Sequence, residues 1–250
     1  MKINKLIVNV DEDINFPGTN CYIVSCSNTK ETIVIDSGCS KEEAENIFKE
    51  IEEHNLKVKY IFTTHGHVDH FCGNKFLKNL TKADLLIHEA DNFLLQYDNW
   101  LKMNEGMPKT PCMRCGEAGQ FIIDIDHEKE VVIGLCKKCG PLYEYSGSPP
   151  GDWLLKDGDE LTVGDLIFKV IHTPGHSKGG SCLYYPEENV LFSGDTLLAE
   201  GHGWTGLPYG SMEEMKVSLE KLMQLPEETN ILPGHGEETT IGEVKKILIQ

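Results

Sequence analysis

The chain has 250 residues, of which 40% are hydrophobic and 25% charged, and its formal net charge at pH 7 is −17. This length and composition are typical of a globular protein with a sizeable core, in one large domain or two small ones. The negative charge argues against nucleic acid as a partner, because contacts to phosphates need a basic surface. No apolar run approaches the roughly 18–20 residues of a membrane span, so we expect no membrane partner.

The N-terminus and the cysteines favour a cytoplasmic protein. The apolar stretch at residues 3–10 is short and interrupted by polar residues, unlike a signal peptide. Four of the nine cysteines form two C-x-x-C pairs, and the odd remainder fits a reducing compartment better than a disulfide framework. The other five are expected to be small buried hydrophobes: Cys21, Cys26, Cys39, Cys72 and Cys182.

The first part of the chain alternates predicted strands and helices. Strands rich in β-branched and aromatic residues are expected at residues 3–10, 20–24, 31–36, 58–62 and 84–87. Ser40 and Glu43 form a capping box that opens a helix to about residue 54. A shorter helix is predicted around residues 73–80, and another is predicted to begin near Glu89. Short turns between the N-terminal strands indicate an antiparallel or mixed sheet.

The last hundred residues show the same kind of pattern. Strands are expected at residues 160–163, 166–171, 182–185, 190–192 and 230–232. The first two form a hairpin that turns at Gly164 and Asp165. Helices are predicted at about residues 211–225 and from about Ile241. Alternation of strands and helices on this scale is typical of an α/β architecture.

A histidine-rich motif directly follows the strand at residues 58–62. Three imidazoles and a carboxylate fall between residues 65 and 70, in Thr64-His65-Gly66-His67-Val68-Asp69-His70. Imidazole is the commonest side-chain metal ligand, and carboxylates complete hydrolytic metal sites. The motif therefore predicts a metal centre at the end of a strand, provided that other parts of the chain supply more ligands.

Three later strands end in further candidate ligands. They are His176 in Thr173-Pro174-Gly175-His176, Asp195 in Ser193-Gly194-Asp195-Thr196, and His235 in Pro233-Gly234-His235-Gly236. Each of these residues alone would be an ordinary loop residue. Together with the histidine-rich motif, they indicate a site that is assembled from distant parts of the sequence at converging strand ends.

Residues 104–150 break the strand and helix pattern and contain both C-x-x-C pairs. The pairs flank a predicted hairpin at residues 120–125 and 130–135, and they consist of Cys112, Cys115, Cys136 and Cys139. This arrangement is typical of a zinc ribbon with one structural Zn²⁺, and rubredoxin-like iron is the alternative because it uses the same four thiolates. We interpret residues 104–150 as a zinc-ribbon insertion that metal binding folds, between parts 1–103 and 151–250 of the main domain.

The motifs resemble those of the metallo-β-lactamase superfamily and, within it, the hydroxyacylglutathione hydrolase (glyoxalase II-like) branch. The similarity extends to Asn20-Cys21-Tyr22, Val34-Ile35-Asp36-Ser37-Gly38, His88-Glu89-Ala90-Asp91 and residues 232–243. It covers nearly the whole chain outside residues 104–150. The resemblance implies a four-layer αβ/βα sandwich with a two-metal site at one edge of its two sheets.

The resemblance also divides the candidate ligands between two metals bridged by Asp195: His65, His67 and His176 for one, and Asp69, His70 and His235 for the other. Imidazoles and carboxylates suit two Zn²⁺ ions, with Fe or Mn as alternatives. A hydroxide bridging the metals would attack the substrate carbonyl. Asp69 would orient this nucleophile and pass a proton to the leaving group as a catalytic residue.

The expected activity is that of a dinuclear metal-dependent hydrolase that cleaves a thioester, ester or lactone of a small metabolite. Two alternatives stay open. One is a mononuclear-iron persulfide dioxygenase, whose relatives keep a similar set of His and Asp residues. The other is a redox or scaffold protein in which a rubredoxin-like insertion is the working part. The insertion could also shape the mouth of the site, join two copies into a homo-oligomer or bind a partner.

The loop after Asp195 departs from the glyoxalase II-like pattern. Relatives commonly show Gly-Arg-x-Asp-Leu-Pro, where this chain has Gly203-Trp204-Thr205-Gly206-Leu207-Pro208. Trp204 should therefore reshape the rim of the site. The candidate substrate contacts are Lys178, for a carboxylate, and His202, Trp204 and Tyr209. The chain ends soon after His235, so we expect no C-terminal helical domain of the kind that binds glutathione in longer relatives.

Overall fold

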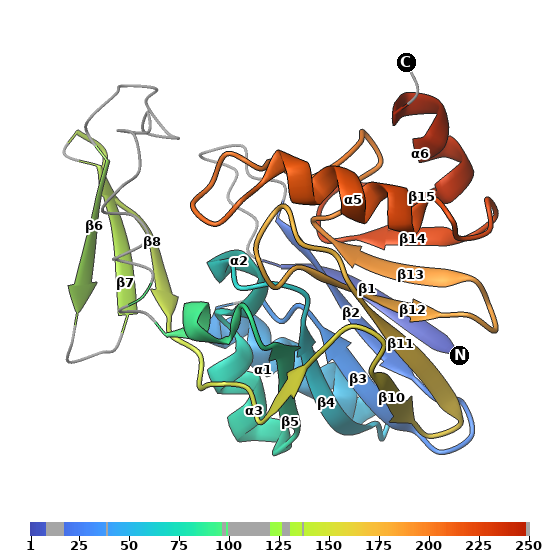
Figure 1. Ribbon diagram of the computed structural model, residues 1–250. Helices are drawn as coiled ribbons and strands as arrows, with labels where there is room; N and C mark the ends of the chain where they lie inside the picture. The colour runs from blue at the N-terminus through green and yellow to red at the C-terminus, as the bar shows by residue number, and fades with distance from the viewer. Residues whose placement is uncertain are drawn as a thin grey trace.

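Two β-sheets of six strands each form the body of the molecule (Figure 1). The computed structural model describes residues 1–8, 18–38, 40–96, 99, 121–126, 131–136 and 138–248. In spatial order, the first sheet consists of β1 (Lys2–Val8), β2 (Thr19–Ser25), β3 (Glu31–Ile35), β4 (Lys57–Thr63), β5 (Asp84–His88) and β9 (Trp153–Leu155). The second consists of β10 (Glu160–Val163), β11 (Leu166–His172), β12 (Ser181–Tyr185), β13 (Val190–Gly194), β14 (Asn230–Pro233) and β15 (Thr239–Thr240).

Both sheets are mixed, as the short turns predicted. In the first sheet, β1 to β3 are antiparallel, whereas β3, β4, β5 and β9 run parallel. In the second, β10 to β13 are antiparallel and β13 pairs in parallel with β14. Parallel neighbours need a crossover connection, and the helical segments after β3, β4 and β13 provide it.

The predicted helices are confirmed with small shifts of their ends. They are α1 (Lys41–Glu53), α3 (Asn74–Thr81), α5 (Met212–Leu222) and α6 (Ile241–Leu248). Ser40 caps α1, and its capping box with Glu43 is present. One short helix, α2 (Val68–Phe71), lies inside the histidine-rich motif and was not predicted.

The helix predicted to begin near Glu89 does not start there. A turn follows β5, in which the Asp91 amide donates to the His88 carbonyl at 3.0 Å, and the next helical element among the described residues is the 3₁₀ helix η2 (Asn92–Leu95). Asn99 is also helical. The carboxylate of Asp91 accepts from the amides of Gly66 and Gly179 in other loops, so it does not cap a helix of its own.

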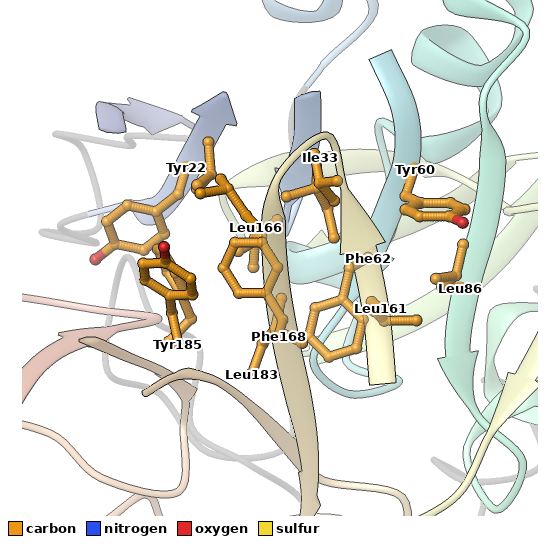
Figure 2. Close-up of a cluster of buried hydrophobic side chains, with 14 of the residues drawn as sticks. Tyr22, Ile33, Tyr60, Phe62, Leu86, Leu161, Leu166, Phe168, Leu183 and Tyr185 are labelled. Carbon is orange, nitrogen blue, oxygen red and sulfur yellow. The ribbon is translucent and has the colours of Figure 1, made fainter. Parts of the chain in front are cut away.

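The body has four layers, in the order helices, sheet, sheet and helices, and three hydrophobic clusters join them. The largest fills the space between the sheets, and Figure 2 shows its aromatic side chains, among them Tyr22, Phe62 and Phe168. A second joins the outer face of the first sheet to α1 and α3, and a third joins the second sheet to α5 and α6. The predicted αβ/βα sandwich is therefore confirmed. Of the five cysteines predicted to be buried, Cys39 lies outside the described residues and the other four are buried.

A third, three-stranded sheet falls within the segment interpreted as an insertion. It consists of β6 (Phe121–Asp126), β7 (Val131–Cys136) and β8 (Gly140–Ser146), all antiparallel. The predicted hairpin is present as β6 and β7, whereas β8 was not predicted. Cys136 pairs with Gly140, so the second C-x-x-C pair spans the turn between β7 and β8. Cys112 and Cys115 lie outside the described residues, and the Cys₄ site stays a prediction.

In the part of the chain that the structure describes, no helix has the length and apolar character needed to cross a membrane.

Candidate metal centre

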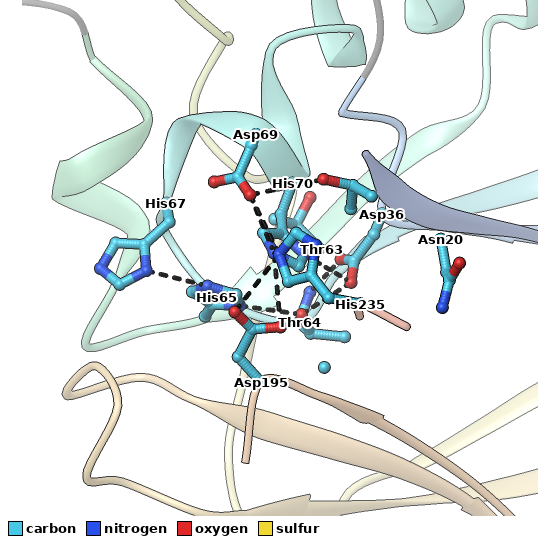
Figure 3. A network of polar contacts seen from close by, with 12 residues as sticks. Asn20, Asp36, Thr63, Thr64, His65, His67, Asp69, His70, Asp195 and His235 are labelled. Atoms are coloured by element: carbon cyan, nitrogen blue, oxygen red, sulfur yellow. Dashed lines mark hydrogen bonds and ion pairs between the residues drawn. The ribbon is translucent and has the colours of Figure 1, made fainter. Parts of the chain in front are cut away.

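All seven predicted ligands converge where β4, β11, β13 and β14 end, and Figure 3 shows six of them side by side. Their ligand atoms form overlapping groups in which every atom lies within 4.8 Å of the others. One group is the trio of His65, His67 and His176, and another is the trio of Asp69, His70 and His235. A third group, with Asp195, connects His65 and His70 from the two trios.

Close backbone approaches shape the histidine-rich motif. A Cβ atom on Gly66 would lie 2.6 Å from Leu94 of η2, so glycine allows that helix to pack on the motif. His67 is the N-cap of α2, and the single helical turn places Asp69 and His70 beside each other. α2 in turn lies against the strand end of β3, where a Cβ on Gly38 would overlap the carbonyl oxygen of Asp69.

The first trio is compact. His67 Nδ1 lies 3.0 Å from His65 Nε2 and 2.8 Å from His176 Nε2, and all three side chains are buried. In a tetrahedral site with Zn–N bonds of about 2.0–2.1 Å, neighbouring ligand atoms lie only a little over 3 Å apart. The spacing of the three nitrogens is therefore close to that of ligands around one ion.

The second trio is similar, and Asp195 reaches both trios. His235 Nε2 lies 3.2 Å from His70 Nε2 and 3.2 Å from Asp69 Oδ2. Asp195 Oδ2 lies 3.4 Å from His176 Nε2 and 3.5 Å from His235 Nε2. Its Oδ1 lies 3.6 Å from His70 Nε2 and, among the described residues, is a buried oxygen with no hydrogen bond. A cation between the trios would satisfy this oxygen.

The outer nitrogens of four imidazoles are held by hydrogen bonds. His70 Nδ1 lies 2.9 Å from Asp36 Oδ2, His176 Nδ1 lies 2.7 Å from the Trp204 carbonyl, and His235 Nδ1 lies 2.8 Å from the Gly18 carbonyl. His65 Nδ1 lies 3.0 Å from the Thr64 hydroxyl. Carboxylate and carbonyl oxygens only accept, so Nδ1 of His70, His176 and His235 carries a proton, and the neutral form of each ring then keeps its lone pair on Nε2, which faces the centre. This tautomer is the one that binds a metal.

The charges at the centre favour a cation. Burial lowers the pKa of His65 well below its usual value and that of His67 to about 3, so both rings are neutral. Burial acts in the same direction on His70, but the nearby carboxylates of Asp69, Asp195 and Asp36 outweigh it and raise its pKa. Burial alone would raise the pKa of Asp69 and Asp195, yet His70 and His235 hold both below the usual value. The carboxylates are therefore anionic.

Asp36 supports the centre but was not predicted as a site residue. It is buried at the end of β3 with a positive φ of 55°, a conformation that is uncommon for residues other than glycine. Its carboxylate accepts from the Thr64 amide and hydroxyl, both at 2.8 Å, and from His70 Nδ1. Because Thr64 Oγ1 in turn contacts His65 Nδ1, Asp36 orients one histidine of each trio. The only sequence signal was its place in Val34-Ile35-Asp36-Ser37-Gly38.

Asp91 is the second supporting residue that was missed. It is fully buried and accepts from the Gly66 amide at 2.8 Å, the Ser177 hydroxyl at 2.7 Å and the Gly179 amide at 2.6 Å. Burial raises the pKa of this carboxyl, and the three hydrogen bonds oppose that shift. Asp91 thus ties the loop of His65 and His67 to the loop of His176.

The strand β2 holds the loop of His235. Asn20 Nδ2 donates to the carbonyls of Pro233 at 2.9 Å and Gly236 at 3.0 Å, and the Asn20 amide donates to the Gly234 carbonyl at 2.7 Å. The Tyr22 hydroxyl also donates to the Pro233 carbonyl, at 2.8 Å. These bonds cross between the two sheets, so the first sheet positions a ligand that the second sheet carries.

The predicted substrate contacts lie on loops beside the centre. Trp204 and Tyr209 are 64% and 40% exposed, and the Trp204 carbonyl touches His176 directly. Lys178 Nζ lies over the Tyr209 ring, 5.6 Å from its centroid. His202 Nδ1 bonds to the Gly203 carbonyl of its own loop at 2.8 Å. Contact with substrate stays a prediction for all four residues.

Comparison with known proteins agrees with this geometry. A sequence model described as the metallo-beta-lactamase superfamily matches residues 14–235. An uncharacterized protein of Aquifex aeolicus is 32% identical over 225 residues, which are 90% of this chain and 87% of that protein. The hydroxyacylglutathione hydrolase GloC of Haemophilus influenzae is 29% identical over 229 residues, which are 91% of this chain and 90% of that enzyme. The chain belongs to the metallo-β-lactamase superfamily.

Solved structures show the same fold. The BLEG-1 B3 metallo-beta-lactamase is 25% identical, with a TM-score of 0.74 over 98% of this chain and 97% of its own. The di-iron-bound form of TTHA1623 is 24% identical, with a TM-score of 0.69 over 97% and 98% of the two chains. ETHE1 from Myxococcus xanthus is 22% identical, with a TM-score of 0.65 over 98% and 82%. The superfamily and the buried His and Asp cluster together indicate a site for divalent metal ions.

Proposed function

We propose that the protein is a dinuclear metal-dependent hydrolase that cleaves a thioester, ester or lactone of a small metabolite. The observation that carries this proposal is the pair of ligand trios with Asp195 between them. A single metal would need only one trio, and the second trio would then leave buried charged groups without a function. The similarity to a hydroxyacylglutathione hydrolase over most of the chain supports the same reaction class.

Each trio would hold one metal, and Asp195 would bridge the two. With metal bound, the donors would be neutral imidazoles and anionic carboxylates, which suit Zn²⁺ and are also compatible with Fe or Mn. The orphaned Asp195 oxygen and the four oriented histidines fit such ions. For the insertion we propose a structural Zn²⁺, or less favourably Fe, held by Cys112, Cys115, Cys136 and Cys139.

Bound metal ions would supply a water of lowered pKa and polarise the substrate carbonyl. The chain itself contributes Asp69 at the point where a proton must move. Its carboxylate is 22% exposed, which makes it the most accessible of the centre's carboxylates, and its Oδ2 accepts from the Thr19 hydroxyl at 3.4 Å. Anionic Asp69 can therefore accept a proton from the attacking water and release it to the leaving group.

Metal quantification followed by a substrate panel tests the proposal. We expect about two metal ions per chain beyond those of the insertion, and turnover of at least one member of a panel of thioesters, esters and lactones. One iron per chain with oxygen uptake in the presence of a persulfide would contradict the hydrolase and support the dioxygenase alternative. A visible spectrum of rubredoxin type would instead support the redox alternative.

Asp195→Ala is the sharpest single-residue test of the two-metal arrangement. Removing the carboxylate shared by both trios should lower the metal content of both positions and reduce kcat at least about a thousandfold, since the reaction depends on both. Metal content per chain and thioester hydrolysis measure the two effects. A variant that keeps full metal loading and activity would refute the bridging role.

A further inference from the structure

Among the described residues, the loop that follows Asp195 carries the exposed aromatic side chain of Trp204. Trp204 is 64% exposed, yet its main chain is fixed. The Trp204 carbonyl accepts from His176 Nδ1 at 2.7 Å, and the neighbouring Gly203 amide donates to the Asp195 carbonyl at 3.0 Å. The backbone of Gly203 and Trp204 is therefore hydrogen-bonded to two candidate metal ligands, and the large apolar ring of Trp204 extends from it into solvent.

Gly206 fixes where that ring lies. A Cβ atom on Gly206 would come within 2.6 Å of Trp204 Cε2 and Cζ2 and 2.8 Å of Nε1, so the indole rests on the bare glycine backbone. The φ of Gly206 lies outside the left-handed region, and alanine could adopt its backbone conformation. The glycine is therefore needed for the position of the ring and not for the path of the chain.

Two more exposed aromatic rings are Tyr209, on the same loop as Trp204, and Phe93, in η2. Tyr209 is 40% exposed and Phe93 is 37% exposed, and the two rings meet edge to face with centroids 5.4 Å apart. Phe93 belongs to η2, whose Leu94 packs on Gly66 of the histidine-rich motif. Three exposed aromatic rings therefore lie on segments whose backbone or neighbouring residues contact the candidate ligands, and aromatic rings suit a flat apolar group better than a small polar one.

We propose that Trp204 is a specificity-determining residue that packs against an aromatic or similarly flat apolar group next to the scissile carbonyl, and that Gly206 holds the indole in place. This inference rests on the proposed hydrolase function and names its substrate class. Rigid aromatic side chains give contact area at little entropic cost, and such ring contacts change affinity about 3- to 10-fold.

Paired thioesters of one thiol test the proposal. The phenylacetyl and acetyl thioesters of N-acetylcysteamine differ only in the apolar ring of the acyl group. We expect kcat/KM of the metal-loaded wild type to be higher for the phenylacetyl ester than for the acetyl ester. The ratio of the two kcat/KM values measures this preference. Trp204→Ala should lower this ratio about 5- to 10-fold, and Trp204→Phe should recover most of it. Trp153→Ala, which truncates a 49% exposed tryptophan on β9, should leave the ratio unchanged.

Gly206→Ala tests the role of the glycine. The three atoms nearest to the new methyl group belong to the exposed indole of Trp204, which can turn aside into solvent, so the variant should fold, keep its metal and lower the ratio about as much as Trp204→Ala. In the Trp204→Ala background the same change should have no further effect, because no ring is left to displace. A ratio that neither variant changes would overturn the inference, as would a full additional effect in the double variant. If the wild type hydrolyses no thioester, ester or lactone, the proposed function fails instead.

Discussion

Asp36 controls the proton positions of two histidines from a single buried carboxylate. Its carboxylate accepts a hydrogen bond from His70 Nδ1. It also accepts one from the Thr64 hydroxyl, which in turn contacts His65 Nδ1, so one histidine of each trio depends on Asp36. Partners of this kind typically change metal affinity or activity 10- to 100-fold when they are removed. Asp36 is buried, yet both proposed metal positions depend on its charge.

Asp36→Asn should weaken metal binding about 10- to 100-fold. The amide can donate as well as accept, so it no longer fixes the proton of His70 on Nδ1. Competition with a fluorescent zinc chelator measures the affinity of each variant. The matched control is Asp84→Asn at the start of β5, which pairs with Tyr60 well before the end of β4. Equal affinities in the two variants would contradict the orienting role.

The metal-free protein should lose stability as pH rises above 7. The carboxylates around His70 and His235 raise the pKa of both histidines in the folded protein above the unfolded value of about 6.5. The stability that this protonation provides is complete below the unfolded pKa and is lost as pH rises through the folded pKa. Urea unfolding of chelator-treated and metal-loaded protein at about pH 7 and about pH 9 measures how much the free energy of unfolding falls in each form. A decline of equal size in both forms would contradict this origin.

The position of α2, which carries Asp69 and His70, depends on its close contact with the chain just after β3. Gly38 follows β3, and a Cβ atom there would lie 1.4 Å from the Asp69 carbonyl oxygen and 2.8 Å from the His70 amide. The Gly73 amide also donates to the Ser37 carbonyl at 2.8 Å. The atoms that a Cβ at Gly38 would meet belong to the backbone of α2, which cannot move aside as a side chain can.

Gly38→Ala should therefore destabilise the protein by about 3 kcal/mol and reduce occupancy of the position that involves Asp69 and His70. Thermal unfolding and metal content per chain report the two effects. Gly242→Ala in α6 is the control, because its Cβ would approach the Glu227 carbonyl only to 3.2 Å and alanine favours a helix. We expect that control to change stability by less than about 1 kcal/mol. Full occupancy in Gly38→Ala would show that α2 tolerates displacement.

At the scale of the whole molecule, the centre joins the two sheets. The first sheet supplies the histidine-rich motif and the hydrogen bonds of Asn20, and the second supplies His176, Asp195 and His235. Bound metal should therefore stabilise the complete sandwich and not one half of it, since only the folded arrangement brings the ligands together. The three-stranded sheet of β6 to β8 is separate from both large sheets.

Cys112→Ser should remove one zinc per chain and leave the metal of the His and Asp centre in place. The reason is that the proposed ribbon and the centre share no ligand. Metal content and circular dichroism of the variant measure the two parts, and Cys182→Ser, at a buried cysteine of the second sheet, is the control for a thiol lost elsewhere. Loss of both kinds of metal would show that the insertion and the centre are coupled.

Local pattern was enough to predict most of the elements and the candidate ligands. The capping box at Ser40, the hairpin at Gly164 and the histidine-rich motif each depend on neighbouring residues, so their signals are complete within a few positions. The short strands β9 and β15, of 3 and 2 residues, were missed because they are too short to show a period. No helix begins at Glu89, because the chain turns there and distant loops use the carboxylate of Asp91.

Tertiary structure alone decided which polar residues support the centre. Asp36 and Thr64 are 28 residues apart, Asp91 and Gly179 are 88 apart, and Asn20 and Pro233 are 213 apart. No local pattern encodes such pairs, because a buried carboxylate or amide looks in sequence like any polar residue at a strand end or turn. Folding brings the partners together and makes each hydrogen bond necessary, since a buried polar group without one is costly. The fold class and the candidate ligands follow from motifs in the sequence. The orientation of those ligands depends on hydrogen bonds that form only when the two sheets pack together.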